Sequence, residues 1–128
     1  MNSYLERLLQ SEIDVDGKTI KVDDLKWEQH PVYEGVEMKH LVRGMDTDNH
    51  NSKSLVRISK GSVIKTHNHP NNSESIKFIS GNGTLVLKNK IIKMSPRSSV
   101  DLEKGANHEI RTFDEDVYLI ASFMPALY

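Results

Sequence analysis

The sequence predicts an all-β domain, a barrel or a sandwich, preceded by one short helix. Short runs of valine, isoleucine, leucine and phenylalanine, separated by turn residues, recur from residue 18 to residue 124. Near the N-terminus the pattern differs, because Leu5, Leu8, Leu9 and Ile13 fall on one face of a helix. The length of 128 residues fits a single domain, which we expect to span 1–128.

The elements follow from these patterns in chain order. The helix belongs to an N-terminal helical segment, residues 1–15, in which Ser3 and Glu6 have the spacing of a capping box. Asp16-Gly17 and Asn82-Gly83 are turn signals, because asparagine, aspartate and glycine accept a positive φ at low cost. The predicted strands lie near residues 18–22, 36–42, 54–59, 62–69, 74–80, 83–88, 90–95, 98–102, 108–112 and 116–124. The last of them has apolar residues on both faces, so we expect both faces to be buried.

Composition excludes several classes of function. Lysine plus arginine number 17 and aspartate plus glutamate 18, a formal charge of −1, so no basic field would attract a nucleic acid. The chain has no cysteine, so it has no disulfide or thiolate nucleophile, and nitrogen and oxygen must hold any metal. Neither a signal-peptide pattern nor a long apolar run is present, and we therefore expect a soluble, cytoplasmic protein with no membrane partner.

Three histidines and one glutamate form a candidate metal-ligand set. His67 and His69 are two residues apart, so on a strand they would point to the same face and could chelate one ion. Glu74 follows the turn that begins at Pro70 and could return a carboxylate to that ion, whereas the role of His108 depends on the fold. A His-x-His pair alone is weak support, because surface histidines pair by chance. The full set would leave two open positions on an octahedral ion, an arrangement used for chemistry.

The residues around this set carry a resemblance to a known family. The pattern Gly-x5-His-x-His-x4-Glu-x6-Gly, from Gly61 to Gly81, matches the first cupin motif at every defined position. The second motif is half present: Gly105 and His108 fall correctly, while other residues stand at its first glycine, its proline and its asparagine, namely Arg97, Glu103 and Thr112. The chain resembles a single-domain cupin, with residues 54–124 as the barrel core that carries both motifs.

The resemblance implies a jelly-roll barrel, a double-stranded β-helix, with one divalent transition metal inside, held by His67, His69, Glu74 and His108. The identity of the ion stays open among iron, manganese, nickel, zinc, cobalt and copper. The function expected first is a metal-dependent enzyme acting on a small oxygen-rich molecule that chelates the ion, either a dioxygenase or an isomerase or lyase. The chain also resembles the small metal-binding cupins found among diketone dioxygenases and in anti-sigma factors. The alternative is a non-catalytic module that binds or senses a metal or small ligand.

Other residues have weaker claims to a role. Ile76, Phe78 and Ile110 should wall the site, because alternation places them on the faces of Glu74 and His108. The polar catalytic candidates are Lys65, expected on the strand face of His67, with Arg57, Tyr118 and Tyr33, although each fits a solvated edge position better. Trp27, Phe123 and Met124 could line a pocket, with core packing as the default.

We expect His30, His40 and His50 to be surface residues. The last strand, which is apolar on both faces, and the amphipathic helix suggest a homodimer.

Overall fold

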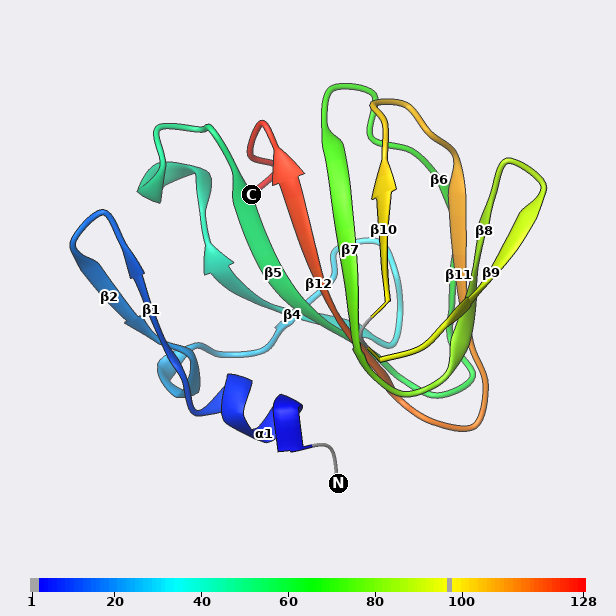
Figure 1. Cartoon of the computed structure of the whole chain (residues 1–128), viewed down its shortest axis with the longest axis horizontal. Coiled ribbons are helices and arrows are strands. Elements are labelled where there is room, and N and C mark those ends of the chain that lie inside the picture. The colour runs from blue at the N-terminus through cyan, green and yellow to red at the C-terminus, as the bar shows by residue number, and fades with distance from the viewer. Residues whose placement is uncertain (1–2, 97) are drawn as a thin grey trace.

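The computed structural model describes residues 3–96 and 98–128 and places about half of them in short strands (Figure 1). Met1, Asn2 and Arg97 lie outside the described part. Helix α1 spans Ser3–Leu9, and two 3-10 turns, η1 and η2, span Val22–Asp24 and Gly44–Asp46. The strands are β1 (Glu12–Val15), β2 (Lys18–Lys21), β3 (Glu28–Gln29), β4 (Val36–Val42), β5 (Ser52–Ile58), β6 (Val63–His67), β7 (Ser73–Ser80), β8 (Gly83–Leu87), β9 (Lys90–Met94), β10 (Ser99–Leu102), β11 (His108–Thr112) and β12 (Val117–Met124).

Two antiparallel sheets face each other across one core. The larger has the order β10-β7-β12-β5-β4-β3 and the smaller the order β6-β11-β8-β9. Side chains from both inner faces form a single buried cluster, with Val56, Phe78 and Leu119 from the larger sheet and Ile64 and Ile110 from the smaller. This arrangement is an all-β jelly roll with one short helix, as the sequence predicts.

The N-terminal segment covers the outer face of the larger sheet. In Figure 1, α1 and the β1–β2 hairpin lie beside that sheet, at the opposite end from β8 and β9. Leu8, Leu9 and Ile13 pack against a second buried cluster that includes Leu41 and Leu55. The amphipathic face of the helix is therefore used within the chain.

The predicted helical segment 1–15 is too long. Helix α1 ends at Leu9, and Ile13 lies in strand β1, where it pairs with Ile20 of β2. The Asp16-Gly17 turn, with φ values of 53° and 86°, folds this stretch into a hairpin. Strand β1 was not expected, because its alternating Ile13 and Val15 were assigned to the helical segment, and β3 was not expected, because its two residues contain no apolar side chain.

The last strand, β12, is buried fully on one face only. Leu119 and Phe123 are buried on its inner face, whereas Tyr118 and Ile120 on the outer face are partly buried and Met124 is 61% exposed. The prediction that both faces are buried is thus half correct. Ile120 packs on the second cluster beneath the N-terminal segment, so this apolar position needs no partner subunit to cover it.

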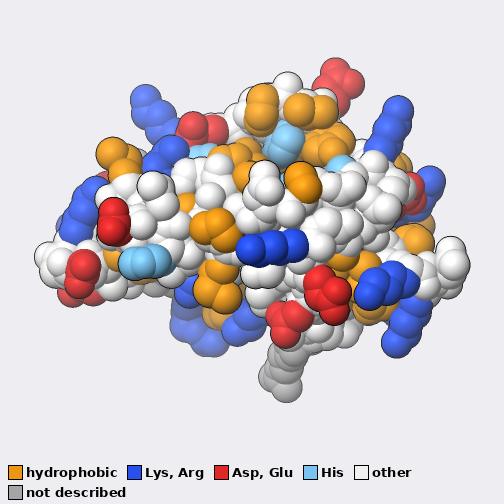
Figure 2. Space-filling view, turned by 90° about the horizontal axis from the view of Figure 1, so that it is seen from above, with side chains coloured by type: hydrophobic (Ala, Val, Ile, Leu, Met, Phe, Trp, Pro, Cys, Tyr) orange, Lys and Arg blue, Asp and Glu red, His pale blue; other side chains and the backbone are white. Residues whose placement is uncertain are grey.

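The surface is mixed in charge. Figure 2 shows lysine, arginine, aspartate and glutamate side chains scattered over the face seen from above, with histidines visible among hydrophobic side chains. None of the helices in the described ranges is long and apolar enough to cross a lipid bilayer.

Candidate metal centre

A cavity of about 320 Å³ opens between the two sheets. Its wall on the larger sheet is formed by inner-face side chains of β4, β5, β7 and β12, and Ile64 and Ile110 supply the wall on the smaller sheet. The three histidines and Glu74 all line this cavity. Ile76 and Ile110 also line it, and Phe78 is buried in the core, so the predicted inward faces of β7 and β11 are confirmed.

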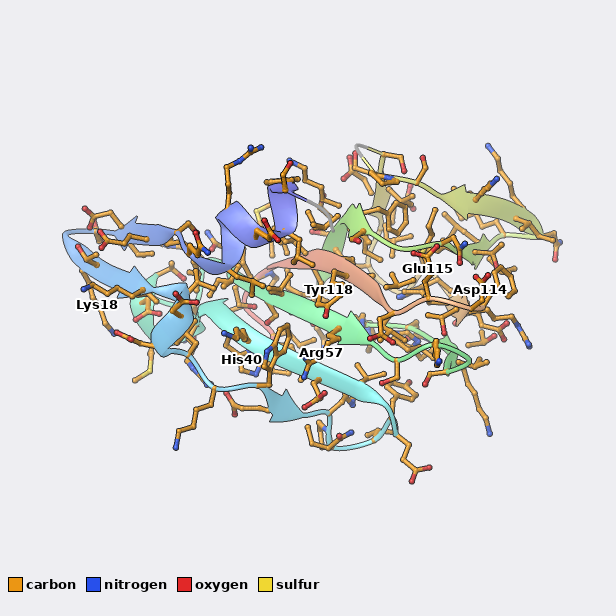
Figure 3. All side chains as sticks on the ribbon, turned by 90° about the horizontal axis from the view of Figure 1, so that it is seen from below. Lys18, His40, Arg57, Asp114, Glu115 and Tyr118 are labelled. Atoms are coloured by element: carbon orange, nitrogen blue, oxygen red, sulfur yellow. The ribbon has the colours of Figure 1, made fainter. Side chains whose placement is uncertain are left out.

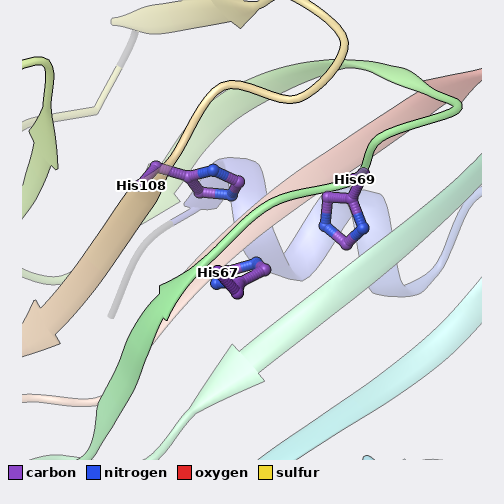
Figure 4. Close-up of side chains that lie close together, drawn as sticks. All are labelled: His67, His69 and His108. Atoms are coloured by element: carbon purple, nitrogen blue, oxygen red, sulfur yellow. The ribbon is translucent and has the colours of Figure 1, made fainter.

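Three imidazoles meet at one side of the cavity (Figure 4). His67 ends β6, His69 lies in the loop that follows, and His108 begins β11. One ring nitrogen from each lies within 4.8 Å of the others, which is close enough for the three to hold a metal ion. The rings of His67 and His108 are closest, with centroids 4.2 Å apart, because these residues are paired across β6 and β11.

Hydrogen bonds to the backbone orient two of these rings. His67 Nδ1 lies 2.9 Å from the Lys65 carbonyl oxygen, and His108 Nδ1 lies 2.9 Å from that of Ala106. A carbonyl oxygen only accepts, so each Nδ1 carries the proton and donates it. In the neutral rings, each Nε2 therefore keeps a lone pair for a metal, the arrangement typical of histidine ligands.

Glu74 brings a carboxylate to the same point. It lies near the start of β7, and its side chain is 8% exposed. Its Oε1 has no hydrogen-bond partner among the described residues, although it lies 3.3 Å from His108 Nε2 and 3.7 Å from His69 Nε2. Ligand atoms about 2.1 Å from a shared metal lie roughly 3 Å apart, so these spacings fit a cation between the groups.

The protonation tendencies of the histidines differ. Burial, followed by the nearby imidazoles, lowers the pKa of both His67 and His69 overall. Burial also acts to lower the pKa of His108, but the Glu74 carboxylate and the Ala106 carbonyl outweigh it and raise the pKa above its usual value. The neutral form that a metal requires is thus favoured at His67 and His69.

The loops hold the site together in a way that strand alternation did not predict. His69 was expected on the same strand as His67, but β6 ends at His67. The His69 carbonyl accepts a hydrogen bond from Gly105 N at 3.0 Å, which joins the two loops that precede Glu74 and His108. Gly105 has a φ of +76°, a conformation suited to glycine, so this matched position of the second motif has a local role.

A β-bulge corrects the expected position of Lys65. Ile64 pairs with Ile110 and His67 with His108. Between these two pairs β6 advances by three residues and β11 by two, so β6 contains one extra residue, a β-bulge. Ile64 and His67 therefore both face the cavity, while Lys65 between them is exposed and outside the cavity lining. Its prediction as a neighbour of His67 on one strand face is wrong, because simple alternation fails at a bulge.

Arg57 and Tyr118 lie on the outer face of the larger sheet, away from the cavity. They are paired on neighbouring strands, β5 and β12, and Figure 3 shows them beside each other. The Arg57 guanidinium lies 4.1 Å from the centre of the Trp27 ring and 2.7 Å from Glu37 Oε1. Neither Arg57 nor Tyr118 is placed to contact a ligand of the cavity, and Trp27 belongs to this outer group.

Of the polar candidates from the sequence, Tyr33 does line the cavity, whereas His30 and Tyr128 were not expected there. His30 and Tyr33 line the mouth, and the centre of the Tyr33 ring lies 5.6 Å from that of the His67 ring, with the two planes tilted by 53°. His30 Nδ1 accepts hydrogen bonds from the backbone N–H groups of Val32 and Tyr33, so the tight turn that brings it to the site was the available signal. Tyr128 also lines the cavity, because residues 125–128 fold back across its edge.

The remaining predictions for histidines and large apolar residues have mixed outcomes. His40 is 7% exposed and lies 2.8 Å from Ser54 Oγ, so its prediction as a surface residue is wrong. His30 is partly buried, and His50 is exposed as predicted. Phe123 lines the cavity and contacts His69 edge to face at 5.1 Å.

Comparison with solved structures shows the same fold in proteins of low sequence identity. A predicted oxalate decarboxylase from Thermotoga maritima is 19% identical, with a TM-score of 0.75 over 83% of this chain and 97% of that one. The polyketide cyclase RemF from Streptomyces resistomycificus is 17% identical, with a TM-score of 0.73 over 84% and 78%. An RmlC-like cupin from Shewanella frigidimarina is 16% identical, with a TM-score of 0.70 over 82% and 87%. No protein-family model and no curated protein matches the sequence.

Proposed function

The chain has the fold of a single-domain cupin, and on that premise we propose that it is a metal-dependent enzyme that acts on a small molecule bound in the cavity. Its metal ligands would be His67, His69, Glu74 and His108. The neighbours named as enzymes, a predicted decarboxylase and a cyclase, support catalysis on this fold.

One observation carries the proposal. Glu74 Oε1 is buried without a hydrogen bond and faces two imidazole nitrogens at 3.3 and 3.7 Å. Leaving a buried carboxylate oxygen unpaired is costly, and in the neutral rings the imidazole nitrogens that face it offer lone pairs rather than N–H groups. A divalent cation bound among these atoms would remove this penalty, which explains why acceptors converge here.

The donor set restricts the metal to ions that take nitrogen and oxygen ligands: iron, manganese, nickel, zinc, cobalt or copper. Bound here, the ion would supply Lewis-acid chemistry, as expected of an isomerase or lyase, or oxygen activation, as expected of a dioxygenase. The chain would contribute binding and exclusion of water. Ile76, Ile110 and Phe123 form an apolar wall beside the ligands, and His30 and Tyr33 flank the mouth.

Metal content tests the proposal. Elemental analysis of the purified protein should find about one transition-metal ion per chain, and His67→Ala should lose most of it. His50→Ala is the matched control. It removes an exposed histidine that does not line the cavity, so this variant should keep the ion. Full metal content in His67→Ala would refute the assigned ligands.

A non-catalytic binding module is the second candidate. Among the described residues that line the cavity, Glu74 is the only carboxylate, so a general acid or base separate from the proposed ligands would have to be His30 or a tyrosine. Oxygen consumption and product formation with the metal-loaded protein distinguish the two candidates. Ligand binding without turnover of any bound ligand would favour the module.

A further inference from the structure

The cavity has two chemically different regions, and the second restricts the ligand. The first is the cluster of His67, His69, His108 and Glu74. The second is a chamber whose walls are mainly apolar side chains of both sheets, including Val56, Leu119 and Ile64. A ligand that reaches the cluster must place the rest of its surface against these walls.

Among the described residues, the chamber offers no permanently charged cation to a second anionic group. No lysine or arginine occurs among the described residues that line it. Nearby cations are engaged elsewhere: Arg57 pairs with Glu37 on the outer face, and the Lys39 Nζ donates to the Val22 carbonyl oxygen at 3.1 Å. A carboxylate or phosphate in the chamber would therefore lose hydration without gaining a charged partner.

The polar groups of the chamber are suited to neutral partners. Ser54, 1% exposed, is the polar side chain that β5 contributes to the wall, and buried His40 lies behind it at 2.8 Å. Burial, followed by the charge of Arg43, lowers the pKa of His40, which keeps this pair uncharged. Burial likewise raises the pKa of Tyr128, so its hydroxyl stays protonated. These groups can hydrogen-bond a hydroxyl or carbonyl but do not neutralise an anion.

We propose that the natural ligand carries its single negative charge in the oxygen group that contacts the histidine–glutamate cluster, and that the rest of the ligand is an uncharged, largely apolar tail. This inference rests on the proposed metal site. A divalent ion with the Glu74 carboxylate leaves one positive charge, which one anionic chelating group balances. The class includes singly charged 2-oxo and 2-hydroxy acids with aliphatic tails and excludes dicarboxylates and phosphorylated sugars.

Two isosteric probes test the charge of the tail. 5-Methyl-2-oxohexanoate and 2-oxoglutarate have the same 2-oxo acid head, but an isopropyl group in the first replaces a carboxylate in the second. Isothermal titration of the zinc-loaded protein should show at least about tenfold tighter binding of the first, since the unpaired carboxylate of the second is penalised. Equal or tighter binding of 2-oxoglutarate would overturn the inference, as would failure of both probes to bind zinc-loaded protein.

A matched pair of variants separates charge from size. Leu127 lines the cavity at its edge and is 36% exposed, so a long polar side chain is tolerated there. Leu127→Lys should reduce the preference for the apolar probe several-fold by offering a cation, whereas Leu127→Gln should leave it unchanged. Identical preferences in the two variants would show that shape sets the selectivity and would overturn the inference.

Failure of the metal site is visible separately. Zinc content is measured before any probe is added, so a protein that does not retain zinc refutes the proposed function together with this inference. A protein that retains zinc and prefers 2-oxoglutarate refutes only the charge assigned to the ligand.

Discussion

At the scale of single residues, Glu74 is a buried carboxylate with one oxygen left unpaired. Its buried Oε1 accepts no hydrogen bond from the described residues, a situation that typically costs about 1–3 kcal/mol. Sites that bind ligands commonly hold such penalties, because the groups are arranged for a bound partner. The same reasoning separates Glu74 from Arg57, whose guanidinium is already satisfied by Glu37 and Trp27.

His40 makes the stability of the fold depend on pH. Burial lowers its pKa in the folded state, whereas the unfolded chain has the ordinary value of about 6.5. Below that pH the unfolded state binds a proton that the folded state does not, so stability falls as the pH falls, by at most about 1.4 kcal/mol per pH unit. His40→Gln, which can keep the bond to Ser54, should lose less stability than wild type between pH 7.5 and 5.5.

Urea unfolding of metal-free protein at the two pH values measures this difference. His50→Gln, at an exposed position, is the control and should behave as wild type. An unchanged pH dependence in His40→Gln would show that other groups account for the effect.

At the scale of elements, turns and bulges place the site more than the strands do. The bulge in β6 turns both Ile64 and His67 inward, and the loop from residue 68 to residue 72 returns the chain so that Glu74 enters β7 on its inner face. A strand slipped by one residue would move these side chains to the opposite face. Glycines at the ends of strands fix the turns on which this register depends.

Gly61 and Gly81, the first and last glycines of the first motif, differ in the space around them. Both have a positive φ, +77° and +94°, so alanine at either costs about 1–2 kcal/mol. A Cβ on Gly61 would meet nothing within 4 Å, whereas one on Gly81 would lie 2.2 Å from the Asp116 carbonyl oxygen. We expect Gly81→Ala to lose about 1–3 kcal/mol more than Gly61→Ala in urea unfolding. Equal losses would mean that the β7–β8 turn can shift to relieve the contact.

At the scale of the whole molecule, metal binding and folding are coupled. The proposed ligands come from β6, the loop after it, β7 and β11, which belong to both sheets, so an ion would connect the two halves of the jelly roll. A ligand that binds only the folded state stabilises it according to its affinity.

This coupling predicts that Glu74→Gln affects the stability of the metal-free protein and its stabilisation by zinc in opposite ways. Zinc at 100 times its dissociation constant should stabilise wild type by about 2.7 kcal/mol and raise Tm by roughly 10 °C. Glu74→Gln removes a buried charge, so its metal-free form should be at least as stable as wild type, yet zinc should raise its Tm much less. Thermal unfolding with and without zinc measures both effects, with Glu103→Gln as an exposed control. Marked loss of stability in metal-free Glu74→Gln would indicate a structural role for the carboxylate.

The sequence by itself determined the all-β class and most strand positions, because alternation is a local property that short segments retain. The jelly roll and the four candidate ligands came from the resemblance to the cupin motifs, which also lie in short segments. Tertiary structure decided which side chains share the cavity. Arg57 and Tyr118 lie on the outer face, the bulge turns Lys65 away, and residues as distant as His30 and Tyr128 reach the mouth. These outcomes depend on register between strands and on chain segments folding back over an edge, and no local pattern encodes such long-range contacts.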